Sequence, residues 1–203
     1  MLPLSLVQMI MTSSAILGIL AGVLSALSYP PYIKAILKGT VRPERASWLI
    51  WTVLTTMGFF TQLAVGATHS LWLPGIQGLG VIIVFLLSIR YGFGGLMKRD
   101  IITLIAAAIT LLIWYSTNNV SIAVYLVVLI DAFGAWLTVV KAYEDPESET
   151  AITWTLSGMG GLSALLAVGT WSPEQLSYPF YIFTANFAVV VAIMIGKSRR
   201  RKV

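Results

Sequence analysis

KGTVRPERASWLIWTVLTTMGFFTQLAVG, residues 38–66, and KAYEDPESETAITWTLSGMGGLSALLAVG, residues 141–169, align without a gap at a shift of 103 residues. Ten of the 29 aligned positions are identical. Shared apolar composition explains the LAVG that ends each stretch. It does not explain the spaced identities Pro43/Pro146, Trp51/Trp154 and Gly58/Gly161. Each stretch begins as a polar loop and continues as an apolar helix, so the chain contains a duplication.

The composition is typical of a membrane protein. Hydrophobic residues make up 58% of the 203 positions, charged residues make up 10%, and the mean hydropathy is +0.87, which excludes an ordinary water-soluble domain. The first apolar window lacks a basic flank and a clear cleavage site, so we expect it to be retained and not removed as a signal peptide. Seven apolar windows of about bilayer-spanning length fall at residues 16–36, 46–66, 71–90, 101–117, 121–140, 151–169 and 176–196.

Basic residues follow a simple alternation along these windows. If each window crosses the bilayer, all 13 Lys and Arg residues lie on one side. Because Lys and Arg flank membrane helices on the cytoplasmic side, the sequence predicts an N-terminus outside and a C-terminus in the cytoplasm, in a bacterial inner (plasma) membrane. The net charge of +5 is then a topology signal, and nucleic acid is not expected as a partner.

The repeat and the windows together predict the architecture. The second copy begins four windows after the first, an even number of crossings, so the two copies are parallel. We therefore expect one all-α transmembrane domain over residues 1–203, with three-helix bundles at 14–92 and 119–197 joined by a linker helix at 100–117. If Pro74 is matched with Pro179, each proline opens the third helix of its bundle, where a missing N–H costs least.

A resemblance to a known family rests on the stretch SYPPYIK at residues 28–34, followed by Lys38-Gly39, Pro43 and SWLIW at 47–51. This stretch resembles the PQ-loop motif of the SWEET, SemiSWEET and PQ-loop membrane proteins, and the two-bundle plan is similar to that superfamily. The resemblance implies movement of a small polar solute through the seam between the bundles.

The match to that motif is incomplete. The second residue of the Pro-Gln pair is Pro31, and the second copy has Phe133-Gly134 in place of the pair. The resemblance implies that Pro30 and Pro31 form a hinge in the first bundle. In the second bundle, glycines such as Gly134 would have to supply the flexibility.

Asp131 is the only acidic residue inside an apolar window, about ten residues or roughly 15 Å from either end. A carboxylate there costs several kcal/mol unless it is paired, protonated or hydrated. Asp131 is therefore predicted to bind solute or to couple protons, and the alternative is a hydrogen bond between helices. Its repeat-related position is Ser28, which gives a chemically unequal pair of candidate site residues.

Amide and indole side chains complete the predicted binding set. Asn186 lies midway along the last window, and the resemblance implies that an Asn there contacts the solute; Val81 stands at the related position, with Gln77 one turn away. Hydrogen bonding between helices is the alternative for both amides. Trp51 and Trp154 are predicted to sandwich a solute, to sit in the interfacial aromatic belt, or to form an inner gate.

The two inner loops differ in the sign of their charge. The first carries Arg42 and Arg45, whereas the second carries Glu147 and Glu149 among other acids. We expect these residues to pair as an ionic latch that closes the inner gate. The alternative is a pair of solvated loops, because exposed ion pairs stabilise little.

The leading functional prediction is a transporter that works by alternating access, with or without proton coupling, on a sugar, a vitamin or nucleoside, or an amino acid. The alternative is a receptor or sorting protein with the same fold. An enzyme is not expected, because His69 is the only His, Cys is absent, and no Ser or Asp has a base beside it. The expected partners are a small solute and the lipid bilayer, with no cofactor or metal; homo-oligomer formation stays open.

Overall fold

The computed structural model describes residues 4–43, 45–92, 98–117 and 119–201. Within these ranges the chain is helical and has no β-strand. Two short 3₁₀ turns, η1 at His69–Leu71 and η2 at Pro146–Ser148, precede α3 and α6. The α-helices are α1 (Leu4–Leu37), α2 (Arg45–Ala64), α3 (Trp72–Tyr91), α4 (Lys98–Thr117), α5 (Val120–Glu144), α6 (Ala151–Leu166) and α7 (Pro173–Arg200).

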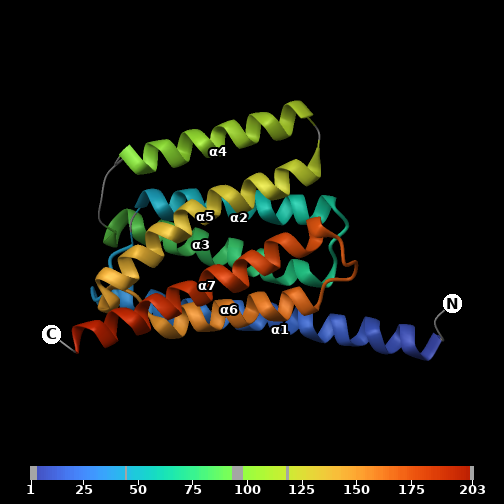
Figure 1. Ribbon diagram of the computed structural model, residues 1–203, viewed down its shortest axis with the longest axis horizontal. Helices are drawn as coiled ribbons and strands as arrows, with labels where there is room; N and C mark the ends of the chain where they lie inside the picture. Colours follow the sequence, from blue (N-terminus) through green and yellow to red (C-terminus); the bar gives the residue numbers. More distant parts are fainter. Residues whose placement is uncertain (1–3, 44, 93–97, 118, 202–203) are drawn as a thin grey trace.

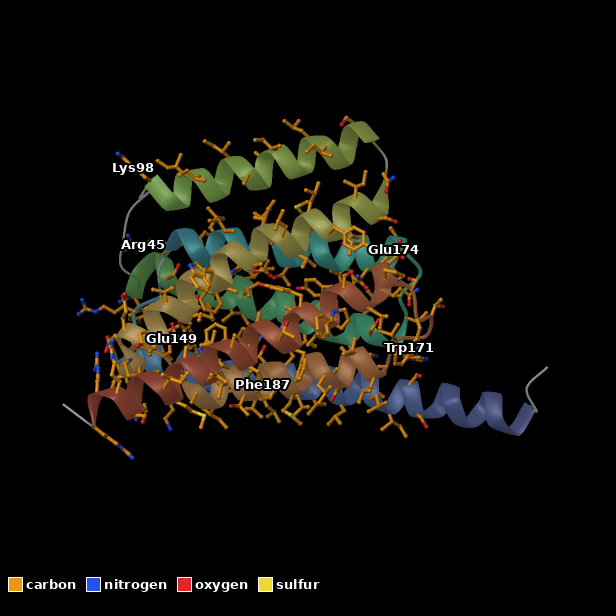
Figure 2. The ribbon with its side chains drawn as sticks, viewed as in Figure 1. Arg45, Lys98, Glu149, Trp171, Glu174 and Phe187 are labelled. Atoms are coloured by element: carbon orange, nitrogen blue, oxygen red, sulfur yellow. The ribbon has the colours of Figure 1, made fainter. Side chains whose placement is uncertain are left out.

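The helices run side by side and alternate in direction, so the two chain ends lie at opposite ends of the molecule (Figure 1). One end, hereafter the basic end, is where α1, α3, α5 and α7 finish and α2, α4 and α6 begin. Every Lys and Arg in the described residues lies there. Figure 2 shows Arg45, Lys98 and Glu149 at the basic end and Trp171 and Glu174 at the opposite end.

Several helices have the length and the apolar surface expected of helices surrounded by lipid. Four of the described helical segments are long and apolar enough to cross a membrane, and α2 and α6 contain shorter apolar stretches. Large apolar side chains on the outside, such as Leu112 and Met194, are about two-thirds exposed at 67% and 65%. Such surfaces are rare on soluble monomers, so the chain is a membrane protein. The four spans are Ser13–Leu37, His69–Tyr91, Val124–Glu144 and Pro173–Arg200.

The packing of the helices repeats along the chain. In the first half α3 packs against both α1 and α2, and in the second half α7 packs against both α5 and α6. The halves meet where α1 packs on α6 and where α2 packs on α5. Because α1 and α2 correspond to α5 and α6 in the repeat, these two contacts are related to each other. Helix α4 lies along the edge, against α5 and α2 (Figure 1).

Small residues allow the helices to approach closely. A Cβ on Gly160 would lie 3.1 Å from the backbone oxygen of Ala21 in α1. A Cβ on the next residue, Gly161, would lie 2.6 Å from the backbone nitrogen of Phe183 in α7. Close backbone approach at small residues is the usual way that helices pack in a membrane, where the hydrophobic effect does not drive association.

The helix boundaries agree with the predicted windows within a few residues, with two exceptions. Helix α1 begins at Leu4, twelve residues before its predicted window, and extends beyond the other helices at the opposite end (Figure 1). The prediction that Pro179 opens the last helix is wrong, because Pro179 lies inside α7. Pro173 takes that position, and the Ser172 side chain caps the helix by accepting from the Gln175 N–H.

Candidate solute-binding site

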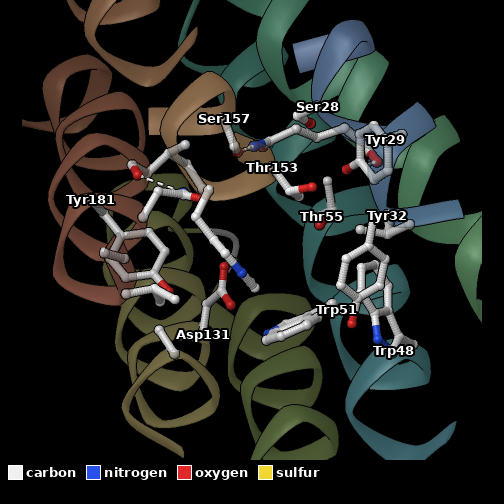
Figure 3. Close-up of a pocket in the computed structure, with 18 of the residues that line it drawn as sticks. Ser28, Tyr29, Tyr32, Trp48, Trp51, Thr55, Asp131, Thr153, Ser157 and Tyr181 are labelled. Atoms are coloured by element: carbon white, nitrogen blue, oxygen red, sulfur yellow. Dashed lines mark hydrogen bonds between the residues drawn. The ribbon is translucent and has the colours of Figure 1, made fainter. Parts of the chain in front are cut away.

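A cavity of about 90 Å³ lies at the junction of the two halves. Side chains from α1, α2, α3, α5, α6 and α7 line it (Figure 3). For comparison, a water molecule occupies about 30 Å³ in the liquid and a drug-sized ligand needs about 300 Å³ or more. All of the predicted binding residues line this one cavity, although up to 158 positions separate them: Ser28, Trp51, Gln77, Asp131, Trp154 and Asn186.

Asp131 provides the only carboxyl group among the lining residues. It sits near the middle of α5, is 8% exposed, and interacts with the Tyr181 hydroxyl and the Trp51 indole. Figure 3 shows Asp131 between these two rings. Gly134, one turn further along α5, makes room for the indole, because a Cβ there would lie 2.9 Å from Trp51 Nε1. The sequence therefore lets an aromatic ring from the first half reach the carboxyl of the second.

Gln77 joins the two halves through hydrogen bonds. Its Nε2 donates to Ser157 Oγ on α6 at 3.3 Å, and its Oε1 accepts from the Tyr178 hydroxyl on α7 at 3.5 Å. Its backbone oxygen accepts from the Tyr29 hydroxyl on α1 at 3.1 Å. The Tyr29 ring lies directly over Gly80, where any side chain would collide with it. Both predictions for Gln77, a place at the site and a bond between helices, are thus compatible with its position.

Asn186 and Ser28 also use their donors within the protein. Asn186 Nδ2 donates to the Ile182 backbone oxygen at 2.7 Å, and Ser28 Oγ donates to the Ser25 backbone oxygen at 2.7 Å. Each bond stays within its own helix. Val81, which stands at the position related to Asn186, lines the cavity as well. The two halves therefore present an amide and an alkyl group from matching places.

Four aromatic residues of the cavity lining contact one another toward the basic end. Ring centroids are 5.3 Å apart for Tyr32 and Trp48, 5.1 Å for Trp48 and Trp51, and 6.4 Å for Trp51 and Trp154. The last pair meets edge to face at 73°. Because the two indoles touch, no slot between them holds a solute in this conformation. The three predictions for this pair stay predictions.

The loop before α6 anchors one member of that pair. Glu149, whose side chain is only 4% exposed, accepts from Trp154 Nε1 at 2.9 Å and from Lys141 Nζ at 3.0 Å. The other predicted latch acid, Glu147, pairs with Lys197 at 3.3 Å. Both acids are thus paired within the second half of the chain.

The predicted partners of these acids have other surroundings. Arg42 is exposed, and Arg45 donates to the backbone oxygens of Ser88 and Gly92, at the end of α3. The ion pairs Lys141–Glu149, Lys197–Glu147 and Arg200–Asp145 all lie within the second half, and the latch between the two inner loops stays a prediction. Glu149 accepts a hydrogen bond from the Trp154 indole instead.

The predicted hinge residues lie inside α1. Pro30 and Pro31 leave the carbonyls of Ala26 and Leu27 without their usual partners in the helix, yet α1 continues to Leu37. Tyr29 and Tyr32, which flank the two prolines, both line the cavity. A bend at this point would therefore move two cavity rings. The hinge itself stays a prediction.

Sequence reasoning missed most of the aromatic lining. Trp48 lies near a helix end, where Trp often belongs to the interfacial belt, but its side chain lines the cavity. The spacing of three residues in Tyr29/Tyr32 and in Tyr178/Tyr181 places each pair on one helix face, and this signal was available in the sequence. Further missed lining residues are Thr55, Ala135, Thr153, Ser157, Ile182, Ala185 and Val189.

Comparison with models of protein families, with curated proteins and with solved structures finds no match to this chain. The function proposed below therefore rests on the cavity, on its place between the two halves, and on the contacts that close it.

Proposed function

We propose that this protein is a membrane transporter that moves a small polar solute by alternating access between two parallel three-helix bundles. One bundle consists of α1 to α3 and the other of α5 to α7, with α4 as the linker, in the plan of the PQ-loop and SWEET-like proteins. In this proposal the basic end faces the cytoplasm. The observation that carries the proposal is the cavity to which all six bundle helices contribute, with Gln77, Asp131 and Asn186 among its lining residues.

The contacts on either side of the cavity support a two-sided gate. Toward the basic end, Trp51 meets Trp154. At the opposite end, Gln62 Nε2 on α2 donates to the Glu174 backbone oxygen at 3.1 Å, and Gln175 Nε2 on α7 donates to the Val65 backbone oxygen at 3.0 Å. Both gates join the first half to the second, so a relative movement of the halves would open one while the other holds.

The free energies involved are small enough for such a movement. An aromatic pair stabilises by about 0.5–1.5 kcal/mol beyond its buried area, and a neutral hydrogen bond by about 0.5–1.5 kcal/mol net. Opening either gate therefore costs a few kcal/mol at most from these contacts. A solute that binds one conformation more tightly can shift an equilibrium of that size.

Cysteine labelling tests the proposal without knowledge of the solute, because the natural chain contains no Cys. Ala135→Cys places one thiol in the cavity lining. Alternating access predicts that a membrane-impermeant thiol reagent labels this residue both in right-side-out and in inside-out vesicles.

Ala164→Cys is the matched control, since Ala164 is fully buried in α6 outside the cavity and should resist the reagent from both sides. Labelling of Ala135→Cys from one side alone, or from neither, would contradict transport. That result would favour the alternative of a receptor or sorting protein with this fold.

A further inference from the structure

The cavity has an unusual chemical lining for a site that binds a neutral polar solute. Seven of its 19 lining residues are Trp or Tyr, one is a carboxylic acid, and none is Lys, Arg or His. The faces of aromatic rings carry partial negative charge, and cations bind over them. The rings and the carboxyl group together thus give the cavity a negative electrostatic potential.

Several donors of the lining are used within the protein. One side-chain N–H of Gln77 bonds to Ser157, and one of Asn186 bonds to the Ile182 backbone. The Tyr29 and Tyr178 hydroxyls both donate to Gln77. The donors that remain, among them the Thr153 hydroxyl and the second N–H of each amide, are neutral groups. A solute that brings positive charge therefore matches the site better than an anion.

Asp131 sharpens this preference. The lining supplies it with the Trp51 indole and the Tyr181 hydroxyl, which are neutral groups, and with no positive charge. An ionised carboxylate this far from either end of α5 is stabilised by a cationic partner or by water. The ends of α5 lie at residues 120 and 144, so Asp131 is near its centre. A cationic solute would supply that partner on binding.

We infer that the cavity binds a compact organic ammonium ion, held by the Asp131 carboxylate and by the surrounding faces of Trp and Tyr rings. This inference rests on the proposed function for its site and names the class of solute. The size limit follows from the volume of about 90 Å³, which excludes large solutes in this conformation. Trp51 and Tyr181, which flank the carboxyl group, are the rings closest to the charge in this arrangement (Figure 3).

The test compares a cation with a neutral molecule of nearly the same shape. Tetramethylammonium and tert-butanol each have five non-hydrogen atoms and differ mainly in charge. Thermal unfolding of the purified full-length protein is measured with each, and with sodium chloride at the concentration of the ammonium salt. Because a ligand that binds the folded state raises its stability, tetramethylammonium should give a saturating rise of about 2–4 °C. Neither of the other two additives should reproduce that rise.

Two variants locate the effect. Asp131→Asn should remove the rise, whereas Asp145→Asn should keep it, because Asp145 pairs with Arg200 at the surface and lies outside the cavity. If Asp131→Asn does not fold, Trp51→Leu replaces it and should also remove the rise. Equal rises with tetramethylammonium and sodium chloride, no rise at all, or a rise that survives in the cavity variants would overturn the inference.

The thermal-unfolding test of the ammonium ion and the thiol-labelling test of transport can fail independently. A cation effect together with thiol labelling from one side alone would leave the site assigned and would reject transport. Labelling from both sides together with a preference for tert-butanol would keep transport and reject the ammonium ion.

Discussion

Trp51 and Trp154 occupy the same position in the two copies of the repeat, yet their indoles face different carboxyl groups. The Trp154 N–H donates to Glu149, a buried residue of the loop before α6, whereas the Trp51 indole interacts with Asp131 in the cavity. Both acids belong to the second copy. Both copies of the repeat have the Trp ring, but the carboxyl group that it faces differs. One indole therefore bonds to a loop residue, and the other contacts a residue of the candidate site.

The same inequality extends through the cavity. Asp131 and Asn186 of the second half stand opposite Ser28 and Val81 at the related positions of the first. The second half therefore carries the stronger polar groups, while the first half supplies Tyr29, Tyr32, Trp48 and Trp51. In a transporter with such halves, one bundle would recognise the charge of the solute. The rings of the other bundle would enclose the solute.

The largest expected effect comes from removing the charge on one side of this comparison. Asp131→Asn should weaken tetramethylammonium binding by about 30-fold or more, because losing one partner of a buried charge pair costs about 2 kcal/mol at least. Titration calorimetry on the purified protein measures it. Ser28→Ala, at the related position, should change the affinity by less than about threefold, because its hydroxyl already bonds to Ser25. Equal losses would show that the halves share the charge recognition.

The next effect concerns Trp154, whose indole is bonded to Glu149. Glu149→Gln removes the ion pair with Lys141 and weakens the bond to Trp154, so the free energy of unfolding should fall by about 1–3 kcal/mol. Thermal unfolding measures the loss. Glu147→Gln, 72% exposed in its side chain, is the control and should change stability by less than about 0.5 kcal/mol.

The Glu149→Gln change also bears on the gate. In the Ala135→Cys background, freeing Trp154 should speed thiol labelling from the basic end, with no change from the opposite end. Labelling that stays equally slow from the basic end would show that Glu149 stabilises the loop alone.

A smaller effect is expected where Trp51 approaches α5. Gly134→Ala would place a Cβ 2.9 Å from Trp51 Nε1, so the indole must shift. Such crowding costs about 1–3 kcal/mol, and tetramethylammonium affinity should fall several-fold. The intrinsic fluorescence spectrum should change as well. Gly78→Ala is the matched control, because its Cβ would meet Thr55 at an ordinary 3.9 Å, and that variant should keep the affinity of the natural protein.

The smallest effect is expected from the inner loops. Glu147→Lys breaks an exposed pair with Lys197, and exposed pairs stabilise by about 1 kcal/mol at most. Thermal stability should change little, and thiol labelling of Ala135→Cys should stay the same at low and high salt. Salt-dependent labelling would instead support the predicted latch, in which Arg42 and Arg45 pair with the acids of the second loop.

Much of the fold could be predicted because lipid leaves the backbone few options. A segment in the bilayer must satisfy its own N–H and C=O groups, so an apolar window of about 20 residues is a helix. The windows therefore matched the helices closely. Pro179 was misplaced because its pairing with Pro74 by the repeat competed with a local cap at Ser172 and Pro173, and the cap determines where α7 begins.

Part of the candidate site could be predicted from the sequence for the same reason. Polar side chains within apolar windows avoid lipid, so Asp131, Asn186 and Gln77 had to face the interior, and the cavity brings them together. The place of Trp48 in the cavity could not be predicted, because a Trp near a helix end suits the interfacial belt and the cavity equally well. Its contacts with Tyr32 and Trp51 come from helix packing, which no local pattern contains.

By itself, then, the sequence determined the membrane class, the helices, the duplication and the polar residues that must turn away from lipid. These follow from local composition and from the cost of bare polar groups in hydrocarbon. The tertiary structure alone decided that Trp51 touches Trp154, that Glu149 binds the Trp154 indole, and that seven aromatic side chains and one carboxyl group line the same cavity. Those contacts depend on how each helix is rotated against its neighbours, and that rotation is set by the packing of the whole molecule.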